Sequence, residues 1–232
     1  MNNSIETPFP ESNKLIISLY DYTTEWVQPY IKAGYPVICW DEKVEGDILE
    51  NFGSLLMKIE QAIEAGYIPY GILAAPPCTD FAQCGSQWWA KKDAEVRVDD
   101  YWNGVDYHVA YVDMVHILTE WIKDHSPEPL NFWVMENPVG RIEKLVPWIK
   151  PYRKMVWNPC DYGDAYTKKT ILWGEFNTDL PKTPVEPEYI TYGNGKRFPK
   201  IWAGTGGKSE KTKAKRSATP KGFANAFFQA NQ

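Results

Sequence analysis

A cysteine and a glutamate stand where two predicted strands end. Cys78 follows a short apolar stretch and the pair Pro76-Pro77, and Glu136 follows the stretch NFWVM. Proline donates no hydrogen bond to a sheet, so the pair ends the first strand and holds Cys78 rigidly beyond it. A thiolate is a nucleophile, and a carboxyl group in an apolar setting keeps its proton near neutral pH. Together they indicate covalent catalysis assisted by a proton donor.

Each of these residues also has a structural interpretation. Most free cysteines are small buried hydrophobes, so Cys78 by itself fits a core position. Asp41 follows another predicted strand at the spacing where a carboxylate holds a ribose hydroxyl, but a helix N-cap aspartate has the same pattern. The four cysteines show no disulfide framework and the three histidines no zinc spacing. We therefore expect a reducing compartment and no metal, with Cys84 and Cys160 as structural residues.

The elements that must position these residues alternate between strand and helix. Strands are predicted at 14–20, 35–40, 68–75, 131–135 and 170–173, and helices at 24–34, 51–66, 105–123 and 221–231. This alternation predicts βαβ units and a doubly wound, mostly parallel α/β sheet. Ligands bind beyond the carboxyl ends of such strands. Residues 79–104 show no clean periodicity and are interpreted as a long loop, which in a compact domain is usually functional.

The composition fits one α/β domain with a small basic appendage. The chain has 232 residues, of which 44% are hydrophobic and 15% aromatic, enough for a sizeable core. It contains no run of eighteen apolar residues, and its first fourteen residues lack the basic start and apolar run of a signal peptide. We expect a cytoplasmic monomer that makes no contact with membranes.

Positive charge is concentrated near the C-terminus. The net charge is −5, yet residues 195–221 hold nine Lys and Arg residues and a single acid, Glu210. An acidic protein with one basic strip captures a polyanion only at that strip. A charge run is also typical of a solvated surface, so charge alone leaves nucleic acid and a plain exposed segment open.

The motifs around Cys78 and Glu136 resemble those of the cytosine-C5 DNA methyltransferase family. The stretch 75–78, with Phe81 and Gly85, is similar to the family's Pro-Pro-Cys-x-x-Phe-x-x-x-Gly, and 136–138 to its Glu-Asn motif. Further similarities follow in family order at Gly46-Asp47-Ile48, at 160–174 and at Thr219-Pro220-x-Gly222-Phe223-Ala224. The resemblance covers residues 14–231, almost the whole chain.

The resemblance implies a Rossmann-like class I methyltransferase fold and a defined reaction. S-adenosylmethionine would donate a methyl group to carbon 5 of cytosine in DNA. Cys78 would first add to carbon 6, while Glu136 protonates or hydrogen-bonds ring nitrogen 3. The implied catalytic residues are Cys78, Glu136, Lys168 and Lys169. The implied cofactor-binding residues are Tyr20, Asp21, Trp26, Asp41, Asp47, Pro76 and Asn225.

The resemblance also implies that the target base is flipped out of the duplex. Two tryptophans of the long loop would close over it, Arg141 lies near Glu136 in the sequence, and the basic strip would hold phosphates. The predicted nucleic-acid-binding residues are Trp88, Trp89, Arg141, Lys196, Arg197, Lys200, Lys213, Lys215 and Arg216.

The implied organisation is a catalytic domain (14–174), a recognition segment (175–216) and a closing helix (217–232) that packs back on the domain. The recognition segment is smaller than is usual for the family, so we expect weak or very short sequence specificity. This economy fits a phage or mobile-element enzyme that marks its own DNA in the bacterial cytoplasm.

Two elements depart from the family pattern. The first loop, 18–26, lacks the glycines of Asp-x-Phe-x-Gly-x-Gly, which makes close backbone approach to the donor harder. Thr167 and Lys169 stand where the family has arginines, so Lys168 or another group must contact the cytosine. Three alternatives stay open: a modified sulfonium donor such as carboxy-S-adenosylmethionine, a different nucleic-acid substrate such as RNA, and a catalytically inactive relative that only binds nucleic acid.

Overall fold

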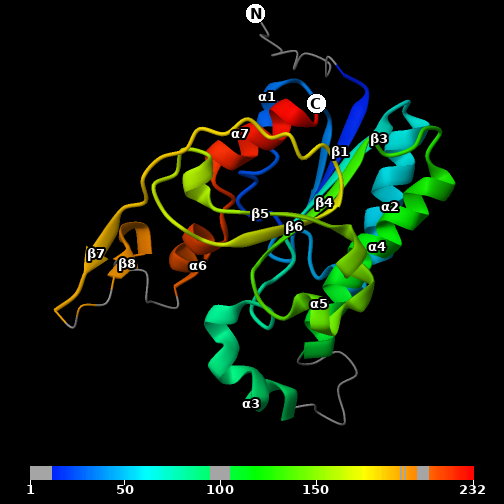
Figure 1. Ribbon diagram of the computed structural model, residues 1–232. Helices are drawn as coiled ribbons and strands as arrows, with labels where there is room; N and C mark the ends of the chain where they lie inside the picture. The colour runs from blue at the N-terminus through cyan, green and yellow to red at the C-terminus, as the bar shows by residue number, and fades with distance from the viewer. Residues whose placement is uncertain (1–11, 95–104, 194, 196, 203–208) are drawn as a thin grey trace, which may run out of the picture.

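A six-stranded sheet runs through the middle of the protein. The computed structural model describes residues 12–94, 105–193, 195, 197–202 and 209–232 (Figure 1). The sheet has the order β2-β1-β3-β4-β6-β5. Its strands are β1 (Lys14–Leu19), β2 (Val37–Trp40), β3 (Ile68–Ala74), β4 (Phe132–Pro138), β5 (Arg153–Trp157) and β6 (Thr170–Glu175). Strands β2, β1, β3 and β4 are mutually parallel, and β6 runs antiparallel to β4 and β5. The predicted α/β class, a mostly parallel Rossmann-like sheet, is confirmed.

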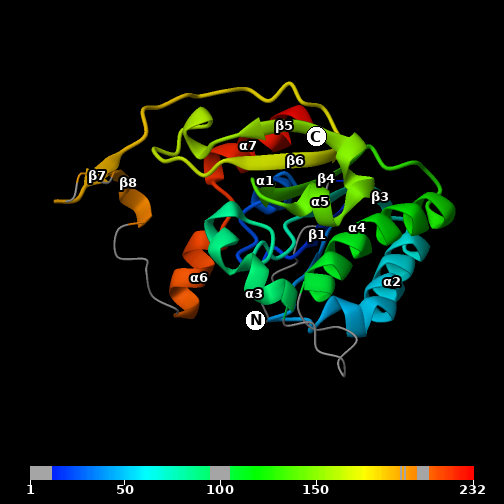
Figure 2. The same cartoon turned by 60° about the horizontal axis from the view of Figure 1, so that its bottom comes forward.

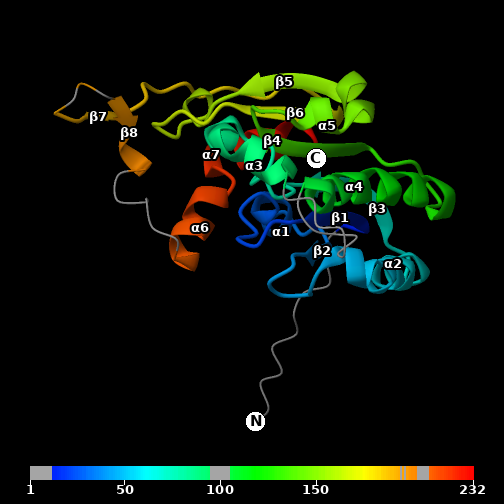
Figure 3. The ribbon, with the colours of Figure 1, turned by 90° about the horizontal axis from the view of Figure 1, so that it is seen from below.

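Helices cover both faces of this sheet (Figure 3). One face carries α2 (Ile48–Glu64), α4 (Val105–His125) and α5 (Ile142–Leu145), and the other carries α1 (Gln28–Lys32) and α7 (Lys221–Ala230). Successive residues of a strand point to opposite faces. Ile17 and Leu19 of β1 therefore join the core under α2 and α4, and Ile16 joins the core under α7. Burial on both faces explains why β1 reads as a continuous apolar run.

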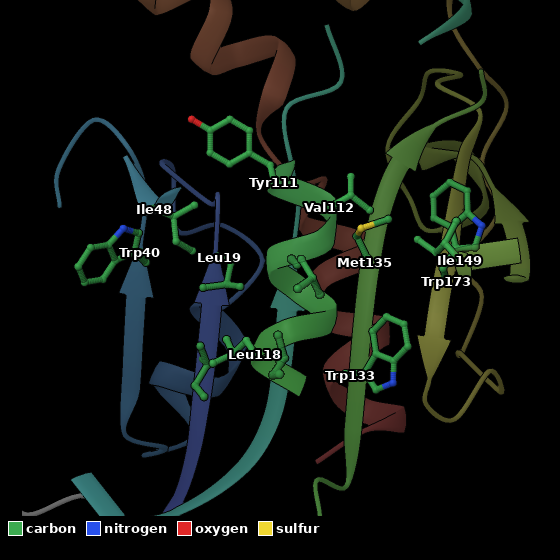
Figure 4. Close-up of a cluster of buried hydrophobic side chains, with 14 of the residues drawn as sticks. Leu19, Trp40, Ile48, Tyr111, Val112, Leu118, Trp133, Met135, Ile149 and Trp173 are labelled. Carbon is green, nitrogen blue, oxygen red and sulfur yellow. The ribbon is translucent and has the colours of Figure 1, made fainter. Parts of the chain in front are cut away.

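The larger core lies between α4 and the strands (Figure 4). Tyr111, Val112 and Leu118 of α4 belong to one buried cluster with Leu19 and Met135 of the sheet, and each of the five is at most 1% exposed. Burying such a side chain contributes about 1.5–3 kcal/mol. The Tyr20 hydroxyl, just past β1, donates to the Tyr111 carbonyl at 2.9 Å. The first turns of α4 are thus held at the carboxyl end of β1.

A smaller core joins the C-terminal helix to the opposite face. Phe223 of α7 stacks on Trp157 with 3.7 Å between ring centroids, and Trp26 lies 5.8 Å from Phe223 and from Phe227. The close approach requires glycine at position 222, where a Cβ atom would lie 1.7 Å from a backbone carbonyl oxygen. The end of the chain is therefore built into the sheet face.

The strand order reverses between β1 and β3. From β1 the chain first moves outward to β2, then returns past β1 to β3 and β4. In doubly wound sheets this switch point opens a crevice beyond the carboxyl ends of the two central strands. The segments after β1 and β3 contain several of the predicted site residues.

Two predicted bounds around this crevice are wrong. The strand predicted to end at 135 continues through Glu136 to Pro138, because these residues pair with β6. The helix predicted at 24–34 begins only at Gln28. Thr24 has a left-handed φ of 55°, which a helix does not accommodate.

Other elements were missed altogether. The region 79–104, predicted to be a loop, contains a 3₁₀-helix at Gln83–Trp88 and helix α3 (Trp89–Ala94) in its described part. Strand β5 was not predicted, because exposed and buried residues do not alternate regularly along it and the apolar run typical of a buried strand is absent. Further 3₁₀-helices are found at Pro147–Tyr152, Pro159–Asp161 and Lys200–Trp202.

Residues 175–216, predicted from the sequence to be a recognition segment, are more regular than their composition indicates. They contain the hairpin β7 (Tyr189–Thr191) and β8 (Arg197–Pro199), followed by helix α6 (Glu210–Ser217). The hairpin projects away from the sheet, while α6 lies at the same end of the sheet as α3 (Figures 1 and 2). Across the described ranges, no helix combines the length and the apolar character needed to cross a bilayer.

Candidate active site

Cys78 is held where β3 leaves the sheet. The register pairs Ala74 of β3 with Met135 of β4, so the next residues of both strands lie side by side. The Asn137 side-chain amide donates to the Pro76 carbonyl at 2.9 Å, and this bond is buried. It satisfies a carbonyl that the departing strand can no longer pair. The Pro-Pro-Cys and Glu-Asn motifs therefore contact each other directly.

The charges around the thiol form a set of three. Burial raises the pKa of the Cys78 thiol, the Lys168 ammonium lowers that pKa, and the Glu136 carboxylate raises it further. Burial likewise raises the pKa of Glu136, which Lys168 also lowers. The arrangement brings together a thiol, a carboxyl group whose pKa is raised by burial, and an ammonium that interacts with both.

Only one of the two predicted catalytic lysines takes part in this set. The Val139 N–H donates to the Lys169 carbonyl at 3.0 Å, which continues the β4–β6 ladder and fixes the register of the segment. The Lys169 side chain is exposed, whereas Lys168 is partly buried. The Lys168 ammonium also donates to the Arg216 carbonyl, near the end of α6, at 3.4 Å. Adjacent residues of extended backbone point in opposite directions, which separates the two lysines.

Replacing Lys168 with methionine is expected to shift the pH dependence of any Cys78-dependent reaction to higher pH. The ammonium lowers the pKa of both Cys78 and Glu136, so its loss raises both. The pH profile of Cys78 alkylation by iodoacetamide measures this directly. Lys169→Met is the matched control and should leave the profile in place. An unchanged Lys168→Met profile would show that the ammonium does not act on the thiol.

The turn after β1 contains no glycine, and two of its non-glycine residues adopt left-handed backbone conformations. Tyr20 has a φ of 62° and Thr24 a φ of 55°, left-handed values that cost a non-glycine residue about 1 kcal/mol each. The Tyr20 ring is turned onto α4, where it packs edge-on against Tyr111. The Tyr20 ring therefore points away from the turn and does not block the approach of a ligand to the turn backbone.

Asp21 closes the same turn from inside. Its carboxylate accepts the Trp26 N–H at 3.1 Å and the Thr23 hydroxyl at 3.2 Å, and its side chain is buried. Burial raises the pKa of Asp21 to about 6, despite the hydrogen bonds that lower it.

The raised pKa of Asp21 predicts a pH-dependent stability. Because the folded pKa exceeds the ordinary value of 3.8, the protonated form is favoured in the folded state. This stabilisation is fully present below the unfolded pKa and is lost as pH rises through about 6. The free energy of unfolding of the wild type should then drop by up to ~3 kcal/mol more than that of Asp21→Asn across this window. Urea unfolding at several pH values measures the difference, and parallel curves for both proteins would contradict it.

Two further carboxylates lie after β2. Asp41 accepts the Lys43 N–H at 3.1 Å, and burial raises its pKa. Asp47 caps α2 by accepting the Leu49 N–H at 2.9 Å, and its second oxygen accepts the Tyr107 hydroxyl of α4. Partly buried carboxylates beside the switch point fit the ribose and adenine groups of a nucleoside cofactor. The residues present are thus compatible with S-adenosylmethionine, and Asp41 and Asp47 would hold its nucleoside.

Two predicted cofactor residues lie elsewhere. Trp26 is 0% exposed beneath α7, so its ring belongs to the core. Asn225 is exposed on α7 and lines a cavity of about 220 Å³ between α7 and α1, together with Gln28, Lys32 and Lys221. Neither side chain is placed beside Cys78 by any contact of the described residues.

The predicted nucleic-acid residues separate into free and engaged side chains. Trp88 is 54% exposed, whereas Trp89 lies against the Arg141 guanidinium, 4.8 Å from ring centroid to Cζ. Arg141 forms two hydrogen bonds to Asp93, at 2.7 and 2.8 Å.

The basic strip is divided in the same way. Arg197 stacks over Tyr189, and Lys200 pairs with Glu188 at 2.8 Å. Lys215 and Arg216 are exposed on α6. Lys196 and the side chain of Lys213 lie outside the described part of the chain.

Sequence reasoning missed Tyr166. It is 6% exposed, and burial, Asp164 and Glu136 together raise its pKa. Its hydroxyl is therefore close enough to Glu136 to interact with the charge of the carboxylate. The only signal in the sequence is its position two residues before Lys168.

Comparisons with known proteins add little to this picture. No family model and no curated protein matches the chain. Among solved structures, the methyltransferase EhMeth of Entamoeba histolytica is similar at 12% identity, with a TM-score of 0.44, over 77% of this chain and 59% of that one. The chain thus spans less than two thirds of that protein. A likeness at this level says nothing of activity, which has to be argued from the site.

Proposed function

We propose that the protein transfers a methyl group from S-adenosylmethionine to carbon 5 of cytosine in DNA, through a covalent bond between Cys78 and carbon 6. The observation that carries the proposal is the meeting of Cys78, Glu136 and Lys168 at the carboxyl ends of two adjacent strands. The motif resemblance assigns the first two residues to this chemistry, and the geometry supports the assignment.

Each side chain has one role in the proposed reaction. The Cys78 thiolate adds to carbon 6, and the protonated Glu136 carboxyl donates to nitrogen 3, so that the electron pair collects at carbon 5. When bound, S-adenosylmethionine supplies an electrophilic methyl group for that carbon. A solvent water then takes the carbon 5 proton, the nitrogen 3 proton returns to Glu136, and the ring double bond re-forms as the bond to Cys78 breaks and releases the thiolate.

Lys168 favours the thiolate form of Cys78 in the proposed reaction. Burial alone disfavours the thiolate, and a nearby ammonium offsets part of that cost. The same ammonium also acts on Glu136, and it is the one charge among the described residues that lowers the pKa of this carboxyl. We therefore assign it the cytosine contact that the resemblance gives to an arginine, and we leave Lys169 as an exposed residue.

DNA is the proposed substrate because exposed aromatic and basic groups surround this end of the sheet. Flipping a base out of the duplex costs a few kcal/mol of unstacking. The exposed Trp88 can fill the gap that the base leaves. The exposed Lys215 and Arg216 of α6 can reach phosphates, and Arg216 is linked to Lys168 through its carbonyl.

Nucleoside mass spectrometry tests the proposal. DNA incubated with the protein and S-adenosylmethionine should gain one methyl group on cytosine, and Cys78→Ala should give none. Absence of product with the wild type overturns methyl transfer from this donor. A repeat with a cell extract as donor source then separates a modified sulfonium donor, which yields a heavier cytosine, from an inactive DNA-binding relative, which yields none.

A further inference from the structure

A buried carboxylate lies two residues after Cys78. Asp80 is 2% exposed, and one of its oxygens lies 2.6 Å from Nδ1 of His108 on α4. The other oxygen pairs with the Lys92 ammonium of α3. A single side chain thus ties the turn after β3 to two helices. Burying a carboxylate costs free energy unless cations and hydrogen bonds compensate. The contacts of Asp80 with His108 and Lys92 supply this compensation.

The same turn is held from its other side by Arg141. Its backbone N–H donates to the Phe81 carbonyl at 2.9 Å, and its Nε donates to the Asp80 carbonyl at 2.8 Å. Gly140 permits this approach, because a Cβ there would lie 1.8 Å from the Phe81 carbonyl oxygen. The guanidinium continues to Asp93, at the end of α3.

Cys78 is part of the turn that these groups clamp. Its carbonyl accepts the N–H groups of Phe81 and Ala82 at 3.1 and 2.9 Å. The Asp80 side chain and the Cys78 thiol are therefore fixed to one short piece of backbone. A shift of this backbone moves the thiol relative to Glu136, which is fixed separately in β4.

We propose that Asp80, through His108 and Lys92, is a positioning residue that sets the place and exposure of the Cys78 thiol. The imidazole of His108 on α4 and the ammonium of Lys92 on α3 reach this carboxylate, and Arg141 holds its backbone. The proposal rests on the proposed function, in which Cys78 is the nucleophile. It assigns a role to Asp80 that neither the Pro-Pro-Cys motif nor the charge pattern indicates.

The test is Asp80→Asn, which keeps the shape of the side chain and removes its charge. The kcat of methyl transfer should fall about 10- to 100-fold, because small displacements of a reacting group cost this much. The KM for S-adenosylmethionine should stay unchanged. Alkylation of Cys78 by iodoacetamide in the free protein should become several-fold faster, because the loosened thiol is more exposed. Peptide mass mapping separates Cys78 from Cys84.

Glu120→Gln is the matched control. Glu120 is an exposed carboxylate on α4 that also pairs with a lysine and a histidine, Lys123 at 2.6 Å and His116 at 4.0 Å. This variant should change neither kcat nor the alkylation rate. His108→Gln is the second test variant, because Lys92 still compensates Asp80 and the fold is retained.

The two readouts distinguish the possible failures. Opposite changes, slower transfer and faster alkylation at an unchanged melting temperature, support the proposal. Unchanged rates in a folded Asp80→Asn or His108→Gln protein overturn it, as do losses that only follow a lowered melting temperature. Alkylation needs no methyl transfer, so a wild type without product would reject the proposed function while the Asp80 test still holds.

Discussion

Cys78→Ala is expected to lower methyl incorporation into DNA at least about 1,000-fold, because alanine has no thiolate to form the proposed bond to carbon 6. The variant should fold normally, since a half-buried cysteine at a strand end contributes little to the core. The measurement is transfer of a labelled methyl group to DNA, with thermal unfolding as a check on the fold. Residual activity near that of the wild type would remove Cys78 from the mechanism.

DNA containing 5-fluorocytosine makes the same prediction visible as a covalent species. Fluorine at carbon 5 cannot leave as a proton does, so the wild type should remain bound to the base after transfer and migrate as a denaturant-resistant complex. Cys84→Ala is the control: this cysteine is exposed in the 3₁₀-helix six residues on and should leave trapping intact. Trapping that survives in Cys78→Ala would place the nucleophile elsewhere.

Glu136→Gln is expected to lower kcat about 10²- to 10⁴-fold, the usual contribution of a positioned acid. Glutamine keeps the size of the side chain and can donate a hydrogen bond through its amide N–H, but the amide cannot transfer a proton to nitrogen 3. Burial raises the pKa of Glu136, so the wild type retains the required proton to higher pH than an exposed glutamate.

The pH dependence of the methyl-transfer rate should also differ between the wild type and Glu136→Gln. Activity needs Cys78 as thiolate and Glu136 as acid, so the wild-type rate rises with pH as Cys78 loses its proton and falls as Glu136 loses its own. In Glu136→Gln the falling limb should disappear, because only Cys78 still titrates. Steady-state rates across the pH range measure this, and an alkaline limb that persists in the variant would assign that limb to another group.

Local patterns in the sequence were sufficient for the class of fold. The apolar runs of β1 and β3, the helical spacing of α2 and α4, and the glycine that follows α2 depend on neighbouring residues alone, and the parallel α/β sheet was predicted from such patterns. The Pro-Pro-Cys and Glu-Asn motifs were predicted to lie at the carboxyl ends of two strands of one sheet, which share one edge. Only the structure shows that these two strands are neighbours. The antiparallel pairing that extends β4 to Pro138 depends on β6, more than thirty residues away, and no local pattern contains it.

The details of the site were decided by the tertiary structure alone. Lys168 and Lys169 are equivalent in sequence, and only the register of the strand they enter turns one toward Cys78 and the other to solvent. Trp88 and Trp89 are likewise adjacent, yet Arg141 engages one and leaves the other exposed. Asp80 meets His108 across 28 positions of the chain. A sequence states which groups are available, but the energy of a charge or a ring depends on partners and burial, which only the folded chain brings together.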